Sequence, residues 1–352
     1  MARGDAVCGL CGATGLRATV QLPGYQEGNT YNIYDCLNCG TAMAAPLCSL
    51  TTIYQMIYTQ PEQIPGYSRY AEYAHEIKKQ THPLKYLESQ EECYWAIAEA
   101  LRKSARSAQA QILEVGCGLG YLTYALRRSG YLNVLGIDLS ASAIAAARSR
   151  YGDYYQVADV AVFSTESPQT FDAIVVSEVI EHLESPIIFL RALRASLKPN
   201  GFLICTTPNR DFGGWSQQPW ATELPPVHLW WFGESSMNML ARRCDMTVSF
   251  IDFTLWNRRH YRHYQKALLR SYCGAKKQES ILDKNGSTRV KIPTARKRSS
   301  LMRRALNLWH NAIYRLRFPR QWRAKAIATS PCLAVIFQRA DTASKGGQDS
   351  WQ

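Results

Sequence analysis

Four side chains that can move a proton or bind a metal ion lie in two short stretches of the chain. Glu178, Glu181 and His182 form the run Glu-x-x-Glu-His, and His228 follows on a proline-containing loop. An imidazole titrates near neutral pH and can take the proton of a hydroxyl group. Carboxylates and imidazoles together can instead bind a divalent ion such as Mg²⁺. The spacing of 178, 181 and 182 places them on one face if the run is helical. A third interpretation is that Glu181 and His182 only cap or orient that helix.

A second set of residues has the spacing of metal ligands. Two Cys-x-x-Cys-Gly knuckles, separated by 24 residues, contain Cys8, Cys11, Cys36 and Cys39. Each knuckle can direct two thiolates at one tetrahedral Zn²⁺, and a strand expected over 30–35 leads into the second knuckle, as in a zinc ribbon. We expect a closed structural zinc site that holds a small lobe together and takes no part in catalysis. The other seven cysteines lack such spacing and are expected to pack as small apolar residues.

A third set can bind a nucleotide-like ligand. It begins with a turn that contains Glu114, Gly116, Gly118 and Gly120. The turn separates a strand-like run from a helix-like run, and missing Cβ atoms let the backbone approach a ligand closely. Asp138 ends the next strand-like run and can accept hydrogen bonds from ribose hydroxyls. Asp159, followed by Val160, ends the third run and is placed to receive an adenine amino group.

Seven strand-like runs must position these sets. They are expected at 112–115, 134–138, 155–160, 171–177, 201–207, 246–253 and 332–338. Helices are expected over 68–80 and 83–106, and Tyr67, Tyr70 and Tyr73 at the start of the first either cover the ligand pocket or only pack the helix on the domain. The sequence therefore predicts an α/β fold, a Rossmann-like and mostly parallel seven-stranded sheet with helices on both faces. Ligands of such sheets bind at the carboxyl ends of the strands, where the acids and histidines lie.

The net charge of +13 is concentrated in one segment. Residues 256–328 contain 20 Lys and Arg but only two acidic residues, so the rest of the chain is mildly acidic. Leu301–Phe318 has the spacing of an amphipathic helix with a basic side and an embedded tryptophan. Three roles are compatible with this pattern: packing on the protein itself, peripheral contact with an anionic membrane, and, less favoured, contact with nucleic acid.

The chain divides into five segments on these patterns. We expect a zinc-ribbon-like lobe at 1–48, a helical linker or lid at 49–108, the core at 109–255 with its last strand at 331–340, a basic helical insertion at 256–328, and a disordered tail at 341–352. The N-terminus lacks a signal-peptide pattern, and no run approaches the roughly 18 apolar residues of a membrane span. These features predict a cytoplasmic protein, at the inner face of the membrane if the insertion binds there. The oligomeric state cannot be inferred.

The motifs of the core resemble those of class I S-adenosylmethionine-dependent methyltransferases, from about Gln111 to Phe253. The Glu-x-Gly-x-Gly-x-Gly form favours that group over nicotinamide enzymes, since Tyr121 stands where those enzymes have a third glycine. The Glu178–His182 run and the strand LKPNGFLICTTPN are most similar to the branch with ubiquinone-biosynthesis O-methyltransferases and bacterial small-molecule methyltransferases. The resemblance implies S-adenosylmethionine as cofactor, with Glu178 at its methionyl end.

The implied activity is methyl transfer to an oxygen or carbon of a small or lipid-linked molecule, such as a quinone, a sugar or a natural product. His228, His182 and Glu181 are then the catalytic candidates. Four tryptophans on the same loop either wall an apolar acceptor pocket or cover the edge of the sheet: Trp215, Trp220, Trp230 and Trp231. One alternative is an RNA 2′-O-methyltransferase, because small-RNA methyltransferases use a similar Glu/Glu/His/His metal set. Another is a zinc-ribbon interaction protein with a vestigial sheet.

Overall fold

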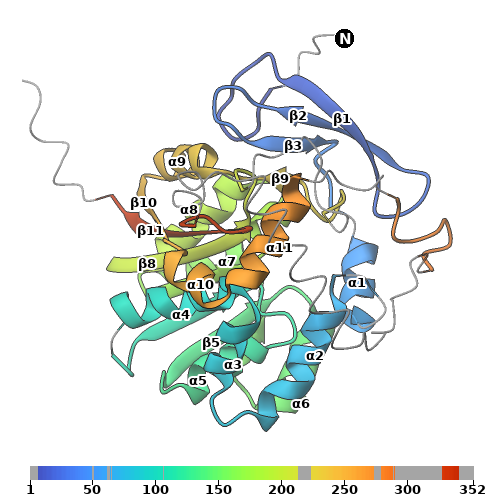
Figure 1. The fold of residues 1–352 in the computed structure, drawn as a ribbon. Helices are drawn as coiled ribbons and strands as arrows, with labels where there is room; N and C mark the ends of the chain where they lie inside the picture. The colour runs from blue at the N-terminus through green and yellow to red at the C-terminus, as the bar shows by residue number, and fades with distance from the viewer. Residues whose placement is uncertain are drawn as a thin grey trace, which may run out of the picture.

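The computed structural model describes residues 7–49, 51–61, 64, 66–105, 107–212, 223–272, 279–287, 289 and 327–340. The amphipathic segment Leu301–Phe318, the tail 341–352, Trp215 and Trp220 lie outside these residues, so the expectations for them stay predictions. Two layers of structure meet in the described part, a large α/β body and a smaller β-sheet that lies beside it (Figure 1).

A seven-stranded sheet forms the centre of the α/β body. Its order is β10-β11-β8-β7-β4-β5-β6. The strands are β4 (Gln111–Val115), β5 (Asn133–Asp138), β6 (Tyr155–Val157), β7 (Phe171–Ser177), β8 (Leu197–Pro208), β10 (Met246–Phe250) and β11 (Cys332–Arg339). Strands β6, β5, β4, β7 and β8 pair in parallel, and β11 runs antiparallel to both of its neighbours. The mostly parallel sheet predicted from the apolar runs is therefore confirmed.

Helices cover both faces of the sheet, as predicted. Leu113 and Val115 of β4 belong to one hydrophobic cluster, and Ile112 belongs to the other. Successive side chains of a strand point to opposite faces of the sheet, so each face has its own cluster. The first cluster includes residues of α7 (Val160–Glu166), α8 (Pro186–Ser196) and α9 (Glu234–Arg243). The second includes residues of α4 (Glu92–Ser104), α5 (Tyr121–Arg128) and α6 (Ala141–Tyr151).

Two expected elements end earlier than the sequence suggested. The third strand stops at Val157 rather than at 160, because Asp159 caps α7 with its side chain. The expected helix 83–106 is two helices, α3 (Pro83–Gln90) and α4, since Glu91 between them has an extended backbone (φ −138°, ψ 147°). The carboxylate of Glu91 forms tertiary contacts instead, with Arg69 at 2.6 Å and with the hydroxyl of Tyr73 at 2.8 Å.

Two helices precede α3. The expected helix 68–80 is α2 (Ser68–Glu76) followed by a 3-10 turn at Ile77–Lys79. Helix α1 (Thr51–Thr59) was not predicted. In Figure 1 it lies between the small sheet and the α/β body, beside α2. The hydroxyl of Tyr58 in α1 lies 3.4 Å from Oδ2 of Asp138, so this helix stands at the carboxyl end of β5.

The small sheet contains the N-terminal strands and one strand from the core. Its order is β1 (Arg17–Pro23), β2 (Thr30–Asp35), β3 (Ala42–Ala45) and β9 (Trp230–Trp231), all antiparallel. The strand expected over 30–35 is thus present as β2. Strand β9, which pairs with β3, comes from far along the chain, and both sheets contribute to one hydrophobic cluster. The lobe boundary at residue 48 stays a prediction.

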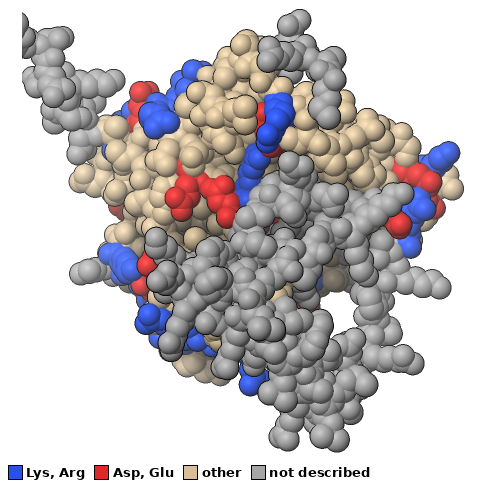
Figure 2. Space-filling model, turned by 45° about the horizontal axis from the view of Figure 1, so that its top comes forward, with Lys and Arg blue, Asp and Glu red and all other residues tan. Residues whose placement is uncertain are grey.

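Most Lys and Arg of 256–328 lie outside the described residues. The described part of this segment includes α11 (Tyr261–Tyr272) and most of α10 (Thr254–Arg259). On the face shown in Figure 2, the visible basic and acidic side chains are interspersed rather than gathered in a field of one sign. None of the described helices combines the length and apolar character that crossing a bilayer requires.

Candidate functional site

The glycine turn after β4 has a backbone that only glycine adopts readily. Gly116, Gly118 and Gly120 all have positive φ, at +74°, +48° and +79°. A Cβ on Gly116 would lie 2.5 Å from Val179 Cγ2, and one on Gly120 would lie 2.6 Å from the Cβ of Ala147. Conformation and space therefore both require glycine at these two positions. The turn is held by hydrogen bonds from the amides of Gly116 and Cys117 to the carbonyl oxygen of Ile137 on the neighbouring strand β5.

Asp138 lies at the end of β5, beside this turn. Its Oδ2 accepts hydrogen bonds from the amide of Gly118 at 2.9 Å and, at 3.4 Å, from the hydroxyl of Tyr58 in α1. Its Oδ1 accepts one from the amide of Ser140 at 2.8 Å, which leaves a lone pair for a ligand hydroxyl. Burial raises the pKa of Asp138 above its usual value. A carboxylate with spare accepting capacity at this position fits a ribose, as the sequence predicted.

Glu114, Asp159 and Val160 also line the cavity beside the turn. The carboxyl group of Glu114 accepts a hydrogen bond from the Thr123 hydroxyl, and burial raises its pKa to about 8. Asp159 is exposed, and its Oδ1 accepts the capping bonds of α7 from Ala161 and Val162 at 2.8 and 3.2 Å. The adenine contact predicted for Asp159 and Val160 stays a prediction.

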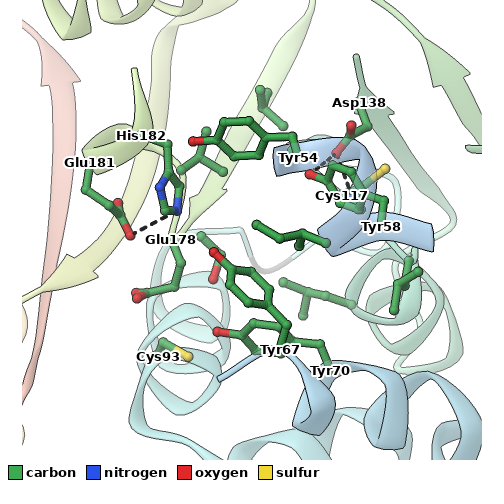
Figure 3. Close-up of a pocket in the computed structure, with 18 of the residues that line it drawn as sticks. Tyr54, Tyr58, Tyr67, Tyr70, Cys93, Cys117, Asp138, Glu178, Glu181 and His182 are labelled. Carbon is green, nitrogen blue, oxygen red and sulfur yellow. Dashed lines mark hydrogen bonds and ion pairs between the residues drawn. The ribbon is translucent and has the colours of Figure 1, made fainter. Parts of the chain in front are cut away.

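One cavity of about 1380 Å³ joins this cradle to the predicted catalytic residues. Helices α1 and α2 supply much of its wall, with the rings of Tyr54, Tyr58, Tyr67 and Tyr70 (Figure 3). Tyr73 also lines the cavity and packs edge-on against Tyr94 and Tyr121, with ring centroids 6.0 and 5.9 Å away. Both interpretations of the α2 tyrosines therefore hold, since they border the pocket and pack the helix on the domain.

Tyr54 and Tyr58 were not predicted as pocket residues, because helix α1 was not predicted from the sequence. Their spacing of four residues places them on one side of a helix and was a usable signal. Trp230 and Trp231 are not among the residues that line the cavity. They are buried in β9, the last strand of the small sheet, so they do not form the predicted wall of this cavity.

Glu181 and His182 both line the cavity, and their side chains lie next to each other. Oε2 of Glu181 accepts a hydrogen bond from the Thr207 hydroxyl at 2.9 Å, and its Oε1 lies 3.7 Å from Nε2 of His182. The Nδ1 atom of His182 lies 2.5 Å from the carbonyl oxygen of Val227. Because a carbonyl oxygen only accepts, Nδ1 carries the proton and Nε2 presents a lone pair.

His228 completes this group from the loop after Leu224. Its ring centroid is 4.7 Å from that of His182, and its side chain is nearly buried. Burial lowers the pKa of His228 well below the usual value, and the neighbouring His182 lowers it further. The ring is therefore neutral at physiological pH. One ligand atom from each of Glu181, His182 and His228 lies within 4.8 Å of the others, a spacing that a single metal ion can bridge.

Glu178 stands apart from this trio. The sequence placed it on one helical face with Glu181 and His182, and this is wrong. Only Ile180–His182 form a 3-10 turn, and Glu178 precedes it with a φ of +54°, a strained value for a residue with a side chain. Its carboxyl group lies in the cavity near Tyr67 and Cys93, as Figure 3 shows. Burial and the nearby Glu181 raise the pKa of Glu178 well above its usual value.

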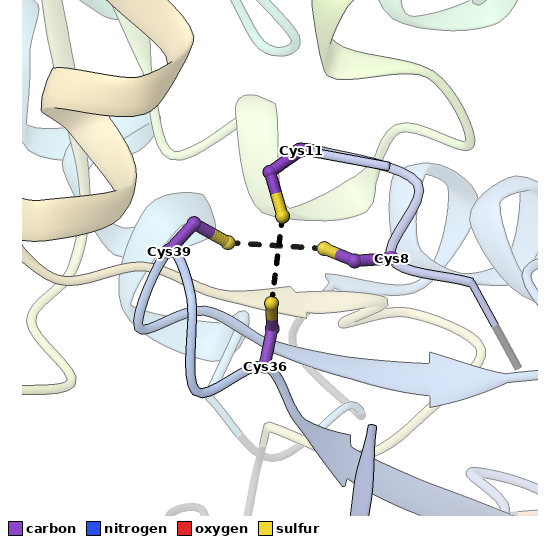
Figure 4. Close-up of side chains that lie close together, drawn as sticks. All are labelled: Cys8, Cys11, Cys36 and Cys39. Atoms are coloured by element: carbon purple, nitrogen blue, oxygen red, sulfur yellow. Dashed lines mark hydrogen bonds between the residues drawn. The ribbon is translucent and has the colours of Figure 1, made fainter. Parts of the chain in front are cut away.

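The four predicted zinc ligands lie together at one end of the small sheet (Figure 4). The sulfur atoms of Cys8 and Cys39 are 3.7 Å apart, and those of Cys11 and Cys36 are 3.5 Å apart. Tetrahedral Zn²⁺ with Zn–S bonds of about 2.3 Å needs sulfur atoms about 3.8 Å apart. The Cys39 side chain lowers the pKa of Cys8 to about 5 by hydrogen bonding to its sulfur. The cluster therefore fits a four-thiolate zinc site.

Comparisons with known proteins agree with this geometry. Residues 87–249 match the family model of a methyltransferase domain. The ubiquinone biosynthesis O-methyltransferase of Histophilus somni is 32% identical over 117 residues, which cover 31% of this chain and 49% of that protein. Its counterpart from Xanthomonas campestris is 38% identical over 106 residues, covering 29% and 44%. The chain thus spans less than half the length of these relatives.

Solved structures show weaker likeness. A putative sarcosine dimethylglycine methyltransferase from Galdieria sulphuraria is 14% identical with a TM-score of 0.42, covering 71% of this chain and 85% of that one. A SAM-dependent methyltransferase from Archaeoglobus fulgidus is 13% identical with a TM-score of 0.37, covering 68% and 92%.

Proposed function

We propose that this chain transfers a methyl group from S-adenosylmethionine to a hydroxyl oxygen of a small molecule. Residues 87–249 match the methyltransferase domain model, and part of the chain is similar to ubiquinone biosynthesis O-methyltransferases. One observation carries the proposal: the cavity that begins at the glycine turn and Asp138 continues without interruption to Glu181, His182 and His228. A donor bound in the cradle and an acceptor bound beside the histidines share that space.

Bound S-adenosylmethionine supplies a methyl group on a positively charged sulfur, which a nucleophile displaces in line. Asp138 would hold the ribose through its free lone pair, and Asp159 with Val160 would border the adenine. The backbone of the glycine turn, next to Glu114, would shape the methionyl side. Glu178 would accept a hydrogen bond from the methionyl end, since its Oε1 is buried and has no partner among the described residues.

His182 is the proposed general base. Its Nε2 lone pair would take the proton of the acceptor hydroxyl as that oxygen attacks the methyl group of the bound donor. The imidazolium that results lies beside Glu181 Oε1, 3.7 Å away, which stabilises the positive charge. The Val227 carbonyl keeps the ring oriented by holding its other nitrogen. Neutral His228 would position the acceptor through its buried Nδ1, which lacks a partner among the described residues.

A metal-assisted reaction is the second candidate, favoured by the spacing of Glu181, His182 and His228. A divalent ion such as Mg²⁺ held there would lower the pKa of the acceptor hydroxyl. Dialysis against a chelator followed by addition of Mg²⁺, Mn²⁺ or Zn²⁺ separates the two. Loss of transfer while one zinc is retained in the cysteine cluster, with recovery when the divalent ion is added, supports the metal. Unchanged transfer with that zinc retained supports the base.

The test of the function begins with the purified full chain. Calorimetry with S-adenosylmethionine and mass spectrometry of co-purified metabolites measure donor binding, and labelled methyl transfer into extract fractions identifies the acceptor class. Label in a small-molecule or lipid fraction supports the proposal. Label only in RNA would establish the RNA methyltransferase alternative. Absence of donor binding would contradict the proposal and favour the alternative of a zinc-ribbon interaction protein with a vestigial sheet.

His182→Gln tests the base directly. We expect kcat to fall at least about 100-fold, the usual contribution of general base catalysis, while donor affinity stays unchanged. His263→Gln is the matched control, because His263 lines the same cavity from α11 and is exposed. Equal kcat in both variants would contradict the role of His182.

Contact of 256–328 with an anionic membrane remains part of the proposal for a lipid-linked acceptor. Sedimentation of the full chain with vesicles that contain phosphatidylserine measures it. Deletion of 290–326, which leaves α10, α11 and β11 in place, should abolish co-sedimentation. Equal co-sedimentation of the full chain with vesicles that lack anionic lipid would contradict an electrostatic contact.

A further inference from the structure

The loop that carries His228 continues directly into the sheet of the cysteine lobe. Two residues after His228, β9 pairs with β3, with Trp230 opposite Met43. The amide of Ala44 donates to the carbonyl of Leu229 at 2.9 Å, and the hydroxyl of Thr41 donates to the carbonyl of Trp231 at 3.2 Å. The cysteine lobe therefore supplies the hydrogen-bonding partner along one side of this segment.

The other side of the same segment binds the turn that contains Glu181 and His182. The amide of Leu229 donates to the carbonyl of Glu181 at 2.8 Å. The indole Nε1 of Trp230 donates to the carbonyl of Leu183 at 2.8 Å. Together with the bond from His182 to Val227, these contacts fix the backbones of 227–230 and 181–183 against each other.

The cysteine knuckles contact this arrangement closely. A Cβ on Gly9, in the first knuckle, would lie 3.1 Å from the indole ring of Trp230. In the second knuckle, the amide of Cys36 donates to the carbonyl of Thr41 at 2.9 Å, so the end of β2 and the start of β3 are tied together. A metal ion that joins the two knuckles would thus fix the first knuckle, which contacts Trp230, and strand β3, which pairs with β9.

The cofactor cradle takes its contacts elsewhere. The glycine turn is bonded to β5 through Ile137, and Asp138 is bonded to Gly118, Ser140 and Tyr58. Ile137, Gly118 and Ser140 lie in segments far from the lobe in sequence, whereas Tyr58 belongs to α1, which follows the lobe and packs in one cluster with Tyr25. The glycine turn and Asp138 therefore take their backbone hydrogen bonds from segments outside the lobe.

We propose that the four-cysteine lobe is a positioning element for the acceptor half of the cavity. Metal binding by Cys8, Cys11, Cys36 and Cys39 holds β3, β3 holds β9, and β9 sets the relative positions of His228 and His182. Trp230 is the positioning residue of this connection, because it contacts both the first knuckle and the turn after His182. Loss of the metal then disables the acceptor half and leaves donor binding intact.

Hydrogen exchange of the full chain, measured by mass spectrometry before and after zinc is removed by a chelator at reducing conditions, tests the structural part without reference to activity. We expect faster exchange in 41–45, 227–232 and 181–184, with 111–116 and 134–138 unchanged, and recovery when Zn²⁺ is added back. Unchanged protection of 227–232 would overturn the proposal. Equal loss at 111–116 would also overturn it, because the metal would then support the whole fold.

Trp230→Phe tests the connection while all four cysteines stay in place, so it avoids the risk that a cysteine variant fails to fold. Phenylalanine keeps an aromatic ring but cannot donate to Leu183. The catalytic readout rests on the proposed function: we expect kcat to fall about tenfold, with donor affinity and zinc content unchanged. Exchange should rise at 181–184.

Trp95→Phe is the matched control, because Trp95 is also buried and lies in α4 within the other hydrophobic cluster. The same kcat and the same exchange in both variants would overturn the role of Trp230. If no acceptor is methylated at all, the proposed function fails, and the exchange measurements still decide this inference.

Discussion

Replacement of Glu114 by Gln tests how the glycine turn is built and gives a pH-dependent signature. Glu114 is buried under the turn, and burial raises its pKa from 4.5 to about 8 in the folded protein. Its ordinary pKa applies once the chain unfolds. The folded state therefore retains the proton over a pH range where the unfolded state releases it. The contribution of Glu114 to the free energy of unfolding is complete below pH 4.5 and is lost as the pH rises toward 8.

The magnitude follows from the same two values. Each pKa unit corresponds to about 1.4 kcal/mol, so the full window of 4.5 to about 8 contributes about 5 kcal/mol. Between pH 5.5 and 7.5 the wild-type chain should lose about 3 kcal/mol of unfolding free energy through this group alone. Glutamine cannot ionise and keeps an oxygen that accepts from Thr123, so Glu114→Gln should not show this loss.

Urea denaturation of both proteins at pH 5.5, 6.5 and 7.5 measures the difference, with donor absent. Other buried acids contribute equally to both proteins and cancel in the comparison. The exposed Glu166→Gln is the control and should follow the wild type. Parallel pH profiles for wild type and Glu114→Gln would refute the argument, because Glu114 would then ionise equally in the folded and unfolded states.

Three further outcomes are expected. Asp138→Ala should weaken S-adenosylmethionine binding at least about tenfold by calorimetry, because it removes the proposed ribose acceptor, and unchanged affinity would sink that assignment. Gly120→Ala should destabilise the chain by about 2–5 kcal/mol in urea, since its φ is +79° and a Cβ would meet Ala147 at 2.6 Å, and a loss near zero would show that the turn adapts. Thr207→Val should lower kcat with little change in donor affinity, because it removes the hydrogen bond that fixes Glu181 beside His182; steady-state kinetics with the acceptor found in extracts decides this.

The glycine turn and the strands around it could be predicted because their signals are local. Apolar runs of strand length separated by turns specify buried parallel strands, and glycines with positive φ are required at the turn whatever surrounds it. The cysteine cluster is equally local, since each knuckle places its own pair of thiols. These patterns need no knowledge of distant partners.

The predictions made from the sequence were wrong where a backbone conformation depends on tertiary contacts. Nothing in the residues near Glu91 marks the break between α3 and α4. Arg69 and Tyr73 bind its carboxylate from another helix, and these contacts accompany the change of direction. Likewise, Glu178 adopts a positive φ, which no turn motif in the sequence announces.

The sequence alone determined the candidates for the chemistry: the glycine turn, Asp138, the two histidines and the four cysteines, because residue type and short spacing limit what each can do. Only the tertiary structure decided which of them act together. Thr41 and Trp231 are 190 residues apart in sequence, yet their hydrogen bond joins the cysteine lobe to the loop that carries His228. Pairing between such distant strands depends on the packing of the whole chain, and short-range patterns carry no information about it.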